Sequence, residues 1–124
     1  MNVVDTSAWL EYLDDGPNAS VFAPAIEAHE ELVVPTLALY EVFKRVTQLT
    51  DEGTALNAVG TMLRGTIVDL SSTLALEAAR LSLASRLAMA DAVILATART
   101  YRATLWTQDA HFAGIEGVRY VAKP

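Results

Sequence analysis

The stretch VVDTSAWLEYL, which runs from Val3 to Leu13, combines a strand pattern with a helix pattern. Its valine pair is typical of a short strand that is buried on both faces. Ser7 is suited to cap a helix, and the apolar residues Trp9, Leu10 and Leu13 follow at helical spacing. A strand that leads directly into a helix is the repeating unit of an α/β fold.

The same alternation continues along the rest of the chain. Short runs rich in valine, isoleucine and leucine are separated by longer stretches with helical spacing, among them one with Leu76 and Leu83. We therefore predict a three-layer α/β/α fold around a central, mostly parallel sheet of about five short strands. The strands are expected at residues 3–4, 32–34, 66–70, 105–107 and 118–121. The helices are expected from Ser7, over residues 36–49, after caps at Asp51 and Ser72, and over residues 90–101.

The composition limits the class of protein. With 124 residues, 52% of them hydrophobic, the chain is long enough for one folded domain, residues 1–124. It contains no cysteine, which excludes disulfides, thiolate metal ligands and a thiol nucleophile. No signal peptide is recognisable, and no uncharged apolar run reaches the ~18 residues that span a membrane. We expect a cytoplasmic protein with no membrane partner.

The net charge of −6 argues at first against a nucleic-acid partner, since phosphate binding needs a basic face. The argument weakens if some of the 15 acidic residues gather around a metal ion. Two of them, Asp5 and Asp109, follow predicted strands, and the carboxyl ends of parallel strands lie at the ligand-binding edge of the sheet. Each could instead cap a helix. Asp69 also lies at a strand end, and we interpret it as structural because two serines and a helix follow.

Asp91 stands in the apolar stretch RLAMADAVILATAR, residues 86–99. On a helix it shares a face with Ile94 and Leu95, which is the face a helix normally buries. Burial of an unpaired carboxylate is expensive. Two interpretations stay open: Asp91 caps the helix at its exposed amino terminus, or it belongs to a functional site.

Glu41 stands four residues before Arg45, so on its own it is explained by a solvated ion pair on a helix. Together with Asp5, Asp91 and Asp109, Glu41 suggests a site for a divalent cation. Carboxylates that meet within a few ångströms repel one another, and a divalent cation removes that repulsion. Carboxylate and water ligands suit Mg²⁺ or Mn²⁺, and such an ion activates water and stabilises charge on a phosphodiester.

The motifs VVDTSAWLEYL, ADAVILATAR and LWTQDAHF, with Glu41 between the first two, resemble the PIN domain over almost the whole chain. More narrowly, the chain resembles the VapC-type ribonuclease toxins of toxin–antitoxin pairs. The resemblance implies an endoribonuclease that depends on Mg²⁺ or Mn²⁺ and hydrolyses RNA phosphodiester bonds with a metal-activated water. It implies Asp5 and Asp91 as metal ligands, Asp109 as a ligand directly or through water, and Glu41 as the group that positions or activates the water.

The resemblance also implies roles for neighbouring residues. Thr6 and Ser7 would hold Asp5 in place by hydrogen bonds, and Thr107 matches a hydroxyl position beside the metal. His111 would at most contact the ligands. The family usually has a glycine before the fourth strand, where this chain has Arg102 and its neighbours.

The resemblance implies three partners: an RNA substrate, a second copy in a homodimer, and a cognate antitoxin whose tail lies over apolar helices near the site. Two alternatives stay open, a receiver-like phospho-acceptor domain that binds Mg²⁺ and a non-catalytic PIN-like interaction module. A receiver needs an acidic pair after the first strand, where this chain offers only Asp5. The candidate antitoxin contacts are Trp9, Leu10, Leu13 and Tyr40, each of which burial in the core explains equally well. The candidate RNA contacts are Lys44, Arg45, Arg86, Arg99 and Arg102.

Overall fold

The computed structural model describes all 124 residues and has one parallel sheet at its centre. Five strands lie in the order β3-β2-β1-β4-β5, so the first strand of the chain is the middle strand of the sheet. In the register, Val3 pairs with Val33 on one side and with Leu105 on the other. The strands are β1 (Asn2–Val4), β2 (Leu32–Pro35), β3 (Thr66–Val68), β4 (Thr104–Thr107) and β5 (Val118–Tyr120).

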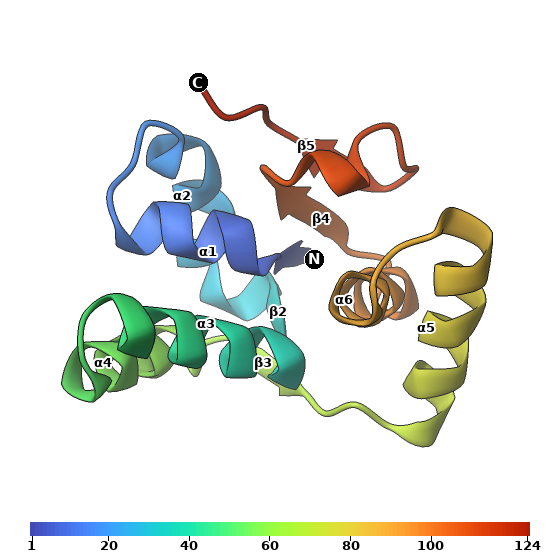
Figure 1. Ribbon diagram of the computed structural model, residues 1–124, viewed down its shortest axis with the longest axis horizontal. Helices are drawn as coiled ribbons and strands as arrows, with labels where there is room; N and C mark the ends of the chain where they lie inside the picture. Colours follow the sequence, from blue (N-terminus) through green and yellow to red (C-terminus); the bar gives the residue numbers. More distant parts are fainter.

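Helices cover both faces of this sheet, which confirms the predicted three-layer α/β/α fold (Figure 1). On one face lie α1 to α4, and on the other lie α5 and α6 with the short 3₁₀-helix η2. The α-helices are α1 (Thr6–Leu13), α2 (Ala19–Glu27), α3 (Thr36–Leu49), α4 (Glu52–Met62), α5 (Ser72–Ser85) and α6 (Met89–Thr100), and the 3₁₀-helices are η1 (His29–Glu31) and η2 (Ala110–Phe112).

The core divides into two apolar layers because side chains alternate along each strand. Val3 and Val33 point to the layer under α6, whereas Val4 and Val34 point to the layer under α1 to α4. α6 is the most deeply buried helix: all seven residues from 92 to 98 are buried against α5 and the strands β1, β2 and β4. This burial explains the nearly uninterrupted apolar sequence of α6, and it holds the amino end of α6 near the sheet.

The sequence predicted all five strands to within two residues at each end, but it did not predict α2. Pro24 lies inside α2 and removes one backbone donor from the helix. Asn18, the residue before α2, caps nothing with its side chain, which donates instead to Gln108 Oε1 and the Ala122 carbonyl. The start signal was present in the sequence, since Asn18 is a residue type that commonly precedes a helix, but α2 contains a proline that normally ends one.

Two predicted caps are displaced by a residue or two. Asp5, and not Ser7, caps α1, and Ser71, and not Ser72, caps α5. The Asp51 cap of α4 is confirmed by its hydrogen bond from the Thr54 amide at 2.7 Å.

The outer face of α5 carries exposed leucines. Leu74 and Ala78 turn toward the core, whereas Leu76 is 61% exposed and Leu83 is 86% exposed. Helical spacing predicted this helix correctly, but it did not distinguish the buried face from the exposed one. No single helix has the length and apolarity to cross a membrane; α5 and α6 meet those criteria only together, as a pair bent by 114°.

Candidate metal centre

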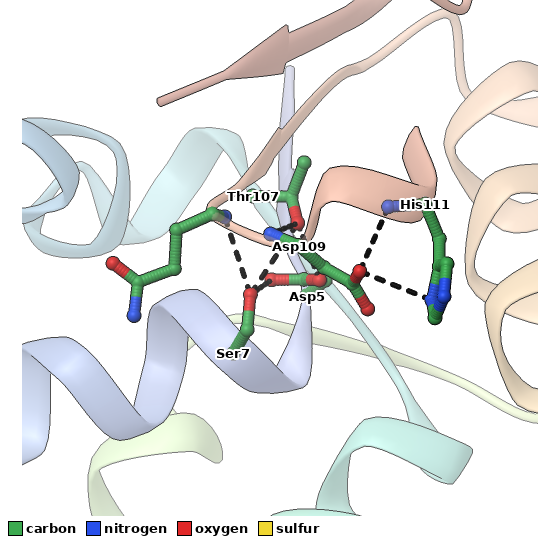
Figure 2. Close-up of polar contacts among 6 residues, drawn as sticks. Asp5, Ser7, Thr107, Asp109 and His111 are labelled. Atoms are coloured by element: carbon green, nitrogen blue, oxygen red, sulfur yellow. Dashed lines mark hydrogen bonds and ion pairs between the residues drawn. The ribbon is translucent and has the colours of Figure 1, made fainter. Parts of the chain in front are cut away.

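The carboxyl ends of the central strands bring acidic residues together at one edge of the sheet. Asp5 follows β1 directly, and Asp109 stands two residues after β4. Because β1 and β4 are parallel neighbours, both residues emerge at the same edge (Figure 2). α3 brings Glu41 from the end of β2, and α6 brings Asp91 in its first turn.

Asp5 is buried and fully engaged in hydrogen bonds. One oxygen, Oδ1, accepts from the Ala8 amide at 2.9 Å and from the Ser7 hydroxyl at 2.7 Å, while Oδ2 accepts from the Thr107 hydroxyl at 2.6 Å. Burial raises the pKa of Asp5 to about 6, although these hydrogen bonds act in the opposite direction. The helix-cap interpretation of Asp5 is therefore correct, and the same carboxylate lies at the edge of the sheet where Asp109 emerges.

Thr107 connects Asp5 to Asp109. Its buried hydroxyl donates to Asp5 and accepts from the Asp109 amide at 2.9 Å. The Asp109 side chain in turn caps η2 by accepting from the His111 amide at 2.9 Å. The Ser7 hydroxyl also accepts from the Gln108 amide at 3.2 Å, so the loop after β4 is fixed at two points.

Glu41 is held by a residue that we expected to hold Asp5. The Thr6 hydroxyl donates to Glu41 Oε1 at 2.6 Å and makes no hydrogen bond to Asp5. The expected Thr6–Asp5 contact was therefore wrong: Ser7, Ala8 and Thr107 supply the donors to Asp5, and the Thr6 side chain reaches across to α3. The alternative ion pair between Glu41 and Arg45 is absent as well.

Asp91 lies in the first turn of α6 but does not cap it. The residue at the cap position is Ala88, and the Asp91 side chain accepts no hydrogen bond from the backbone. The cap interpretation of Asp91 is therefore wrong. Partial burial raises the pKa of Asp91, and the charges of Asp109 and Glu41 raise it further.

The four predicted acids form one electrostatically connected group. The side-chain atoms of Asp91, Asp109 and His111 that could bind a metal ion all lie within 4.8 Å of one another. Asp109 also raises the pKa of Asp5, and Glu41 raises that of Asp91. No lysine or arginine pairs with any of the four, because the ion pairs of the chain are Arg80–Glu77 and His111–Asp109.

This donor set fits a divalent cation, because oxygen-rich sites of uncompensated negative charge suit Mg²⁺ and Mn²⁺. Asp69 lies outside the group, exposed beyond the end of β3. His111 was not predicted as part of the group. A local sequence feature could have predicted its position: Asp109 caps a 3₁₀ turn, so the side chain two residues later lies beside the capping carboxylate.

The candidate RNA-binding basic residues make no ion pair with the four acids. Lys44 lies 5.7 Å from the centre of the Tyr40 ring, and Arg99 reaches the Glu116 carbonyl. Arg99 stands eight residues after Asp91, about 12 Å along α6 at 1.5 Å per residue. Arg102 adopts a left-handed conformation with φ of 52°, which explains why glycine suits this turn.

The family model for the PIN domain matches residues 3–118 of the chain. The chain is a PIN domain. Membership in this family disfavours the receiver-like alternative. No curated protein matches the chain.

Solved structures of toxin–antitoxin proteins share the fold of this PIN domain. A toxin–antitoxin complex from Klebsiella pneumoniae aligns with a TM-score of 0.79 and 26% identity over 96% of both chains. VapBC2 from Rickettsia felis, bound to a DNA fragment of its promoter, aligns with a TM-score of 0.74 and 16% identity over 98% and 97%. The sarcin–ricin loop cleaving toxin VapC20 from Mycobacterium tuberculosis aligns with a TM-score of 0.76 and 16% identity over 94% and 95%.

Proposed function

We propose that this PIN domain is a cytoplasmic endoribonuclease that depends on Mg²⁺ or Mn²⁺ and acts as the toxin of a toxin–antitoxin pair. The observation that carries the proposal is the clustering of Asp91 and Asp109 at the carboxyl edge of the sheet, with Asp5 and Glu41 near enough for charge coupling and none of the four paired with lysine or arginine. The similarity to the Klebsiella pneumoniae complex supports the toxin assignment.

The four acids have different roles in the site. Asp5, Asp91 and Asp109 would hold the cation, with Asp5 kept rigid by its three hydrogen bonds. Glu41 would hold or orient a water, since its second oxygen is free of the Thr6 bond. The cation, when bound, would activate that water and stabilise the charge that develops on the phosphodiester. Ser7, Thr6 and Thr107 position the carboxylates and need not touch RNA.

Cleavage of RNA by the purified protein tests this function. We expect cleavage with Mg²⁺ or Mn²⁺ and none with EDTA. Asp91→Asn should abolish cleavage, and removal of such a group typically lowers rates by at least 100-fold. Asp69→Asn is the matched control, because Asp69 is an exposed aspartate at a strand end outside the group. Equal cleavage by Asp91→Asn and the parent would overturn the metal assignment, and no cleavage at all would favour the non-catalytic alternative.

A groove beside the site is the surface we assign to the antitoxin. It has a volume of about 970 Å³ and lies between α1, α3 and α4, with Ser7 and Gln108 at the end that adjoins the acids. Leu10, Leu13 and Leu49 supply apolar lining, as an apolar helix or strand of a partner requires. Of the four expected contacts, Leu10 and Leu13 line this groove, Tyr40 is exposed but outside its lining, and Trp9 is fully buried, as the alternative of core packing required.

Antitoxin binding can be tested without disturbing the core. Leu49 is 62% exposed in the groove, and Leu63 is 55% exposed outside it. Leu49→Glu should prevent co-purification with the cognate antitoxin while RNA cleavage continues. Leu63→Glu should keep both co-purification and RNA cleavage. Co-purification of Leu49→Glu at the parent's yield would place the antitoxin elsewhere.

The exposed leucines of α5 are the surface we assign to a second copy of the chain. Leu76 and Leu83 are seven residues apart and lie on one helix face. Homodimer interfaces are richer in apolar residues than the rest of a protein surface. Leu83→Glu should therefore convert a dimer to a monomer in light scattering, and a parent protein that is already a monomer would contradict the assignment.

A further inference from the structure

His111 approaches the acids from the solvent side of the site. Its Nδ1 lies 3.2 Å from Asp109 Oδ1, and its donor atom lies within 4.8 Å of those of both Asp91 and Asp109. The ring is 78% exposed, so core packing does not hold it there. Figure 2 shows the ring turned toward the Asp109 carboxylate, on the side away from Ser7.

The backbone explains why the ring stays beside the carboxylate. Asp109 accepts from the His111 amide at 2.9 Å, and this bond fixes the 3₁₀ turn that carries both side chains. The ring has no hydrogen-bond partner other than the contact with Asp109. No other residue binds either ring nitrogen, so Nδ1, which lies beside the Asp109 carboxylate on a short and well-fixed turn, can take a cation as its partner.

We propose that His111 is a ligand of the divalent cation, together with Asp91 and Asp109, and that it makes the site prefer Mn²⁺ to Mg²⁺. The proposal rests on the metal centre of the proposed function. Neighbouring ligands of an octahedral ion with bonds of about 2.1 Å stand about 3 Å apart, close to the separation of the Asp109 oxygen and the His111 nitrogen.

The chemistry of the donors gives the metal preference. Mg²⁺ takes oxygen ligands and keeps several waters. Mn²⁺ shares these oxygen ligands but belongs to the first transition series, whose affinity for nitrogen rises toward Fe, Ni and Cu, so it accepts an imidazole more readily than Mg²⁺ does. A site of carboxylates alone would bind both ions by the same contacts. A nitrogen ligand adds affinity for Mn²⁺ that Mg²⁺ cannot use equally, so the two ions are distinguished by one side chain.

Pulsed EPR of the Mn²⁺-loaded protein tests the ligand directly, because a coordinated imidazole nitrogen modulates the spin echo of Mn²⁺. The chain has two histidines, and His29 lies in η1 before β2, at the opposite edge of the sheet from the acids. The nitrogen signal should be present in the parent and in His29→Gln, and lost in His111→Gln. Circular dichroism should show both variants folded, since neither ring is in the core.

Calorimetric titration with each ion tests the preference. His111→Gln should weaken Mn²⁺ binding by about tenfold, which is 1.4 kcal/mol, and change Mg²⁺ binding by less than about twofold. If Mn²⁺ binds the parent without a nitrogen signal, the His111 assignment is overturned while the metal centre of the proposed function stands. If neither ion binds the parent, both proposals fail. If His111→Gln weakens the binding of Mn²⁺ and Mg²⁺ equally, His111 only orients Asp109, and the proposed preference for Mn²⁺ is overturned.

Discussion

The hydroxyl of Thr6 donates a 2.6 Å hydrogen bond to Glu41, and this bond joins the first turn of α1 to α3 across 35 residues of sequence. No other hydrogen bond holds the Glu41 carboxylate. Asp5 and Asp109, in contrast, are held by backbone amides. Glu41 therefore depends on a single side chain for its orientation.

Thr6→Val removes that bond and leaves the shape of the side chain almost unchanged. We expect cleavage to fall by about 10- to 100-fold, the range found when a partner that orients a site residue is lost. Thr6→Ser should restore most of the activity. Thr47→Val is the control, because the Thr47 hydroxyl on α3 donates to the Phe43 carbonyl and faces no acid. An active Thr6→Val with a parent-like metal affinity would contradict the positioning role.

Asp91→Asn should change stability in the direction opposite to its effect on activity. The pKa of Asp91 is raised by burial and by the charges of Asp109 and Glu41, so at neutral pH its ionised form opposes folding. In EDTA the melting temperature of Asp91→Asn should equal or exceed that of the parent. With Mn²⁺ the order should reverse, since a bound ion stabilises only the protein that holds it. A clear loss of stability in EDTA would show that the side chain supports the fold.

The positions of Asp5 and Asp109 could be predicted because strand ends of a parallel sheet meet at one edge. Both residues follow short apolar runs, and that pattern is visible in the sequence. Asp91 was harder, because a carboxylate in the first turn of a helix suits a cap as well as a site. The structure decides against the cap, since Ala88 occupies that position and α6 leads into the parallel strand β4, which brings the amino end of α6 to the carboxyl edge of the sheet.

Contacts between distant elements could not be predicted. The partner of Thr6 lies on another helix, and nothing near Thr6 in the sequence distinguishes Glu41 from Asp5 as its acceptor. The same limit applies to the leucines of α5, whose spacing fits a core face although Leu76 and Leu83 are exposed. Local patterns specify the helix, whereas the packing of the whole chain decides which of its faces is buried.

The raised pKa of Asp5 makes the metal-free protein less stable as the pH rises. The native pKa is about 6 and the ordinary value is 3.8, so between these values the native state binds more protons than the unfolded state. The free energy of unfolding in EDTA should therefore fall as the pH rises from 4 to 6. The Asp5 contribution lost over this interval is about 2 kcal/mol, out of about 3 kcal/mol for the whole shift at 1.36 kcal/mol per pKa unit. The lowered pKa of Asp51 acts below this range.

Urea denaturation in EDTA at several pH values measures this effect. Asp5→Asn should show a flatter profile above pH 4, whatever its overall stability, because it lacks the titrating group. Saturating Mn²⁺ should also flatten the parent's profile, since the cation favours the ionised carboxylate. A parent protein whose stability in EDTA rises between pH 4 and pH 6 would contradict the raised pKa.

Arg102→Gly should stabilise the protein by about 0.5–1 kcal/mol, because the turn after α6 requires a conformation that disfavours most side chains. Arg102 has a φ of 52°, and its exposed side chain forms no ion pair that the change would remove. The gain is limited because glycine has more freedom in the unfolded chain. Arg99→Gly is the comparison: it removes the same charge from the last turn of α6, together with the hydrogen bond to the Glu116 carbonyl, at a position where glycine disfavours the helix, and it should lower the melting temperature. If Arg102→Gly destabilises the protein as much as Arg99→Gly does, the left-handed turn is not strained, and the glycine usual at this turn has another cause.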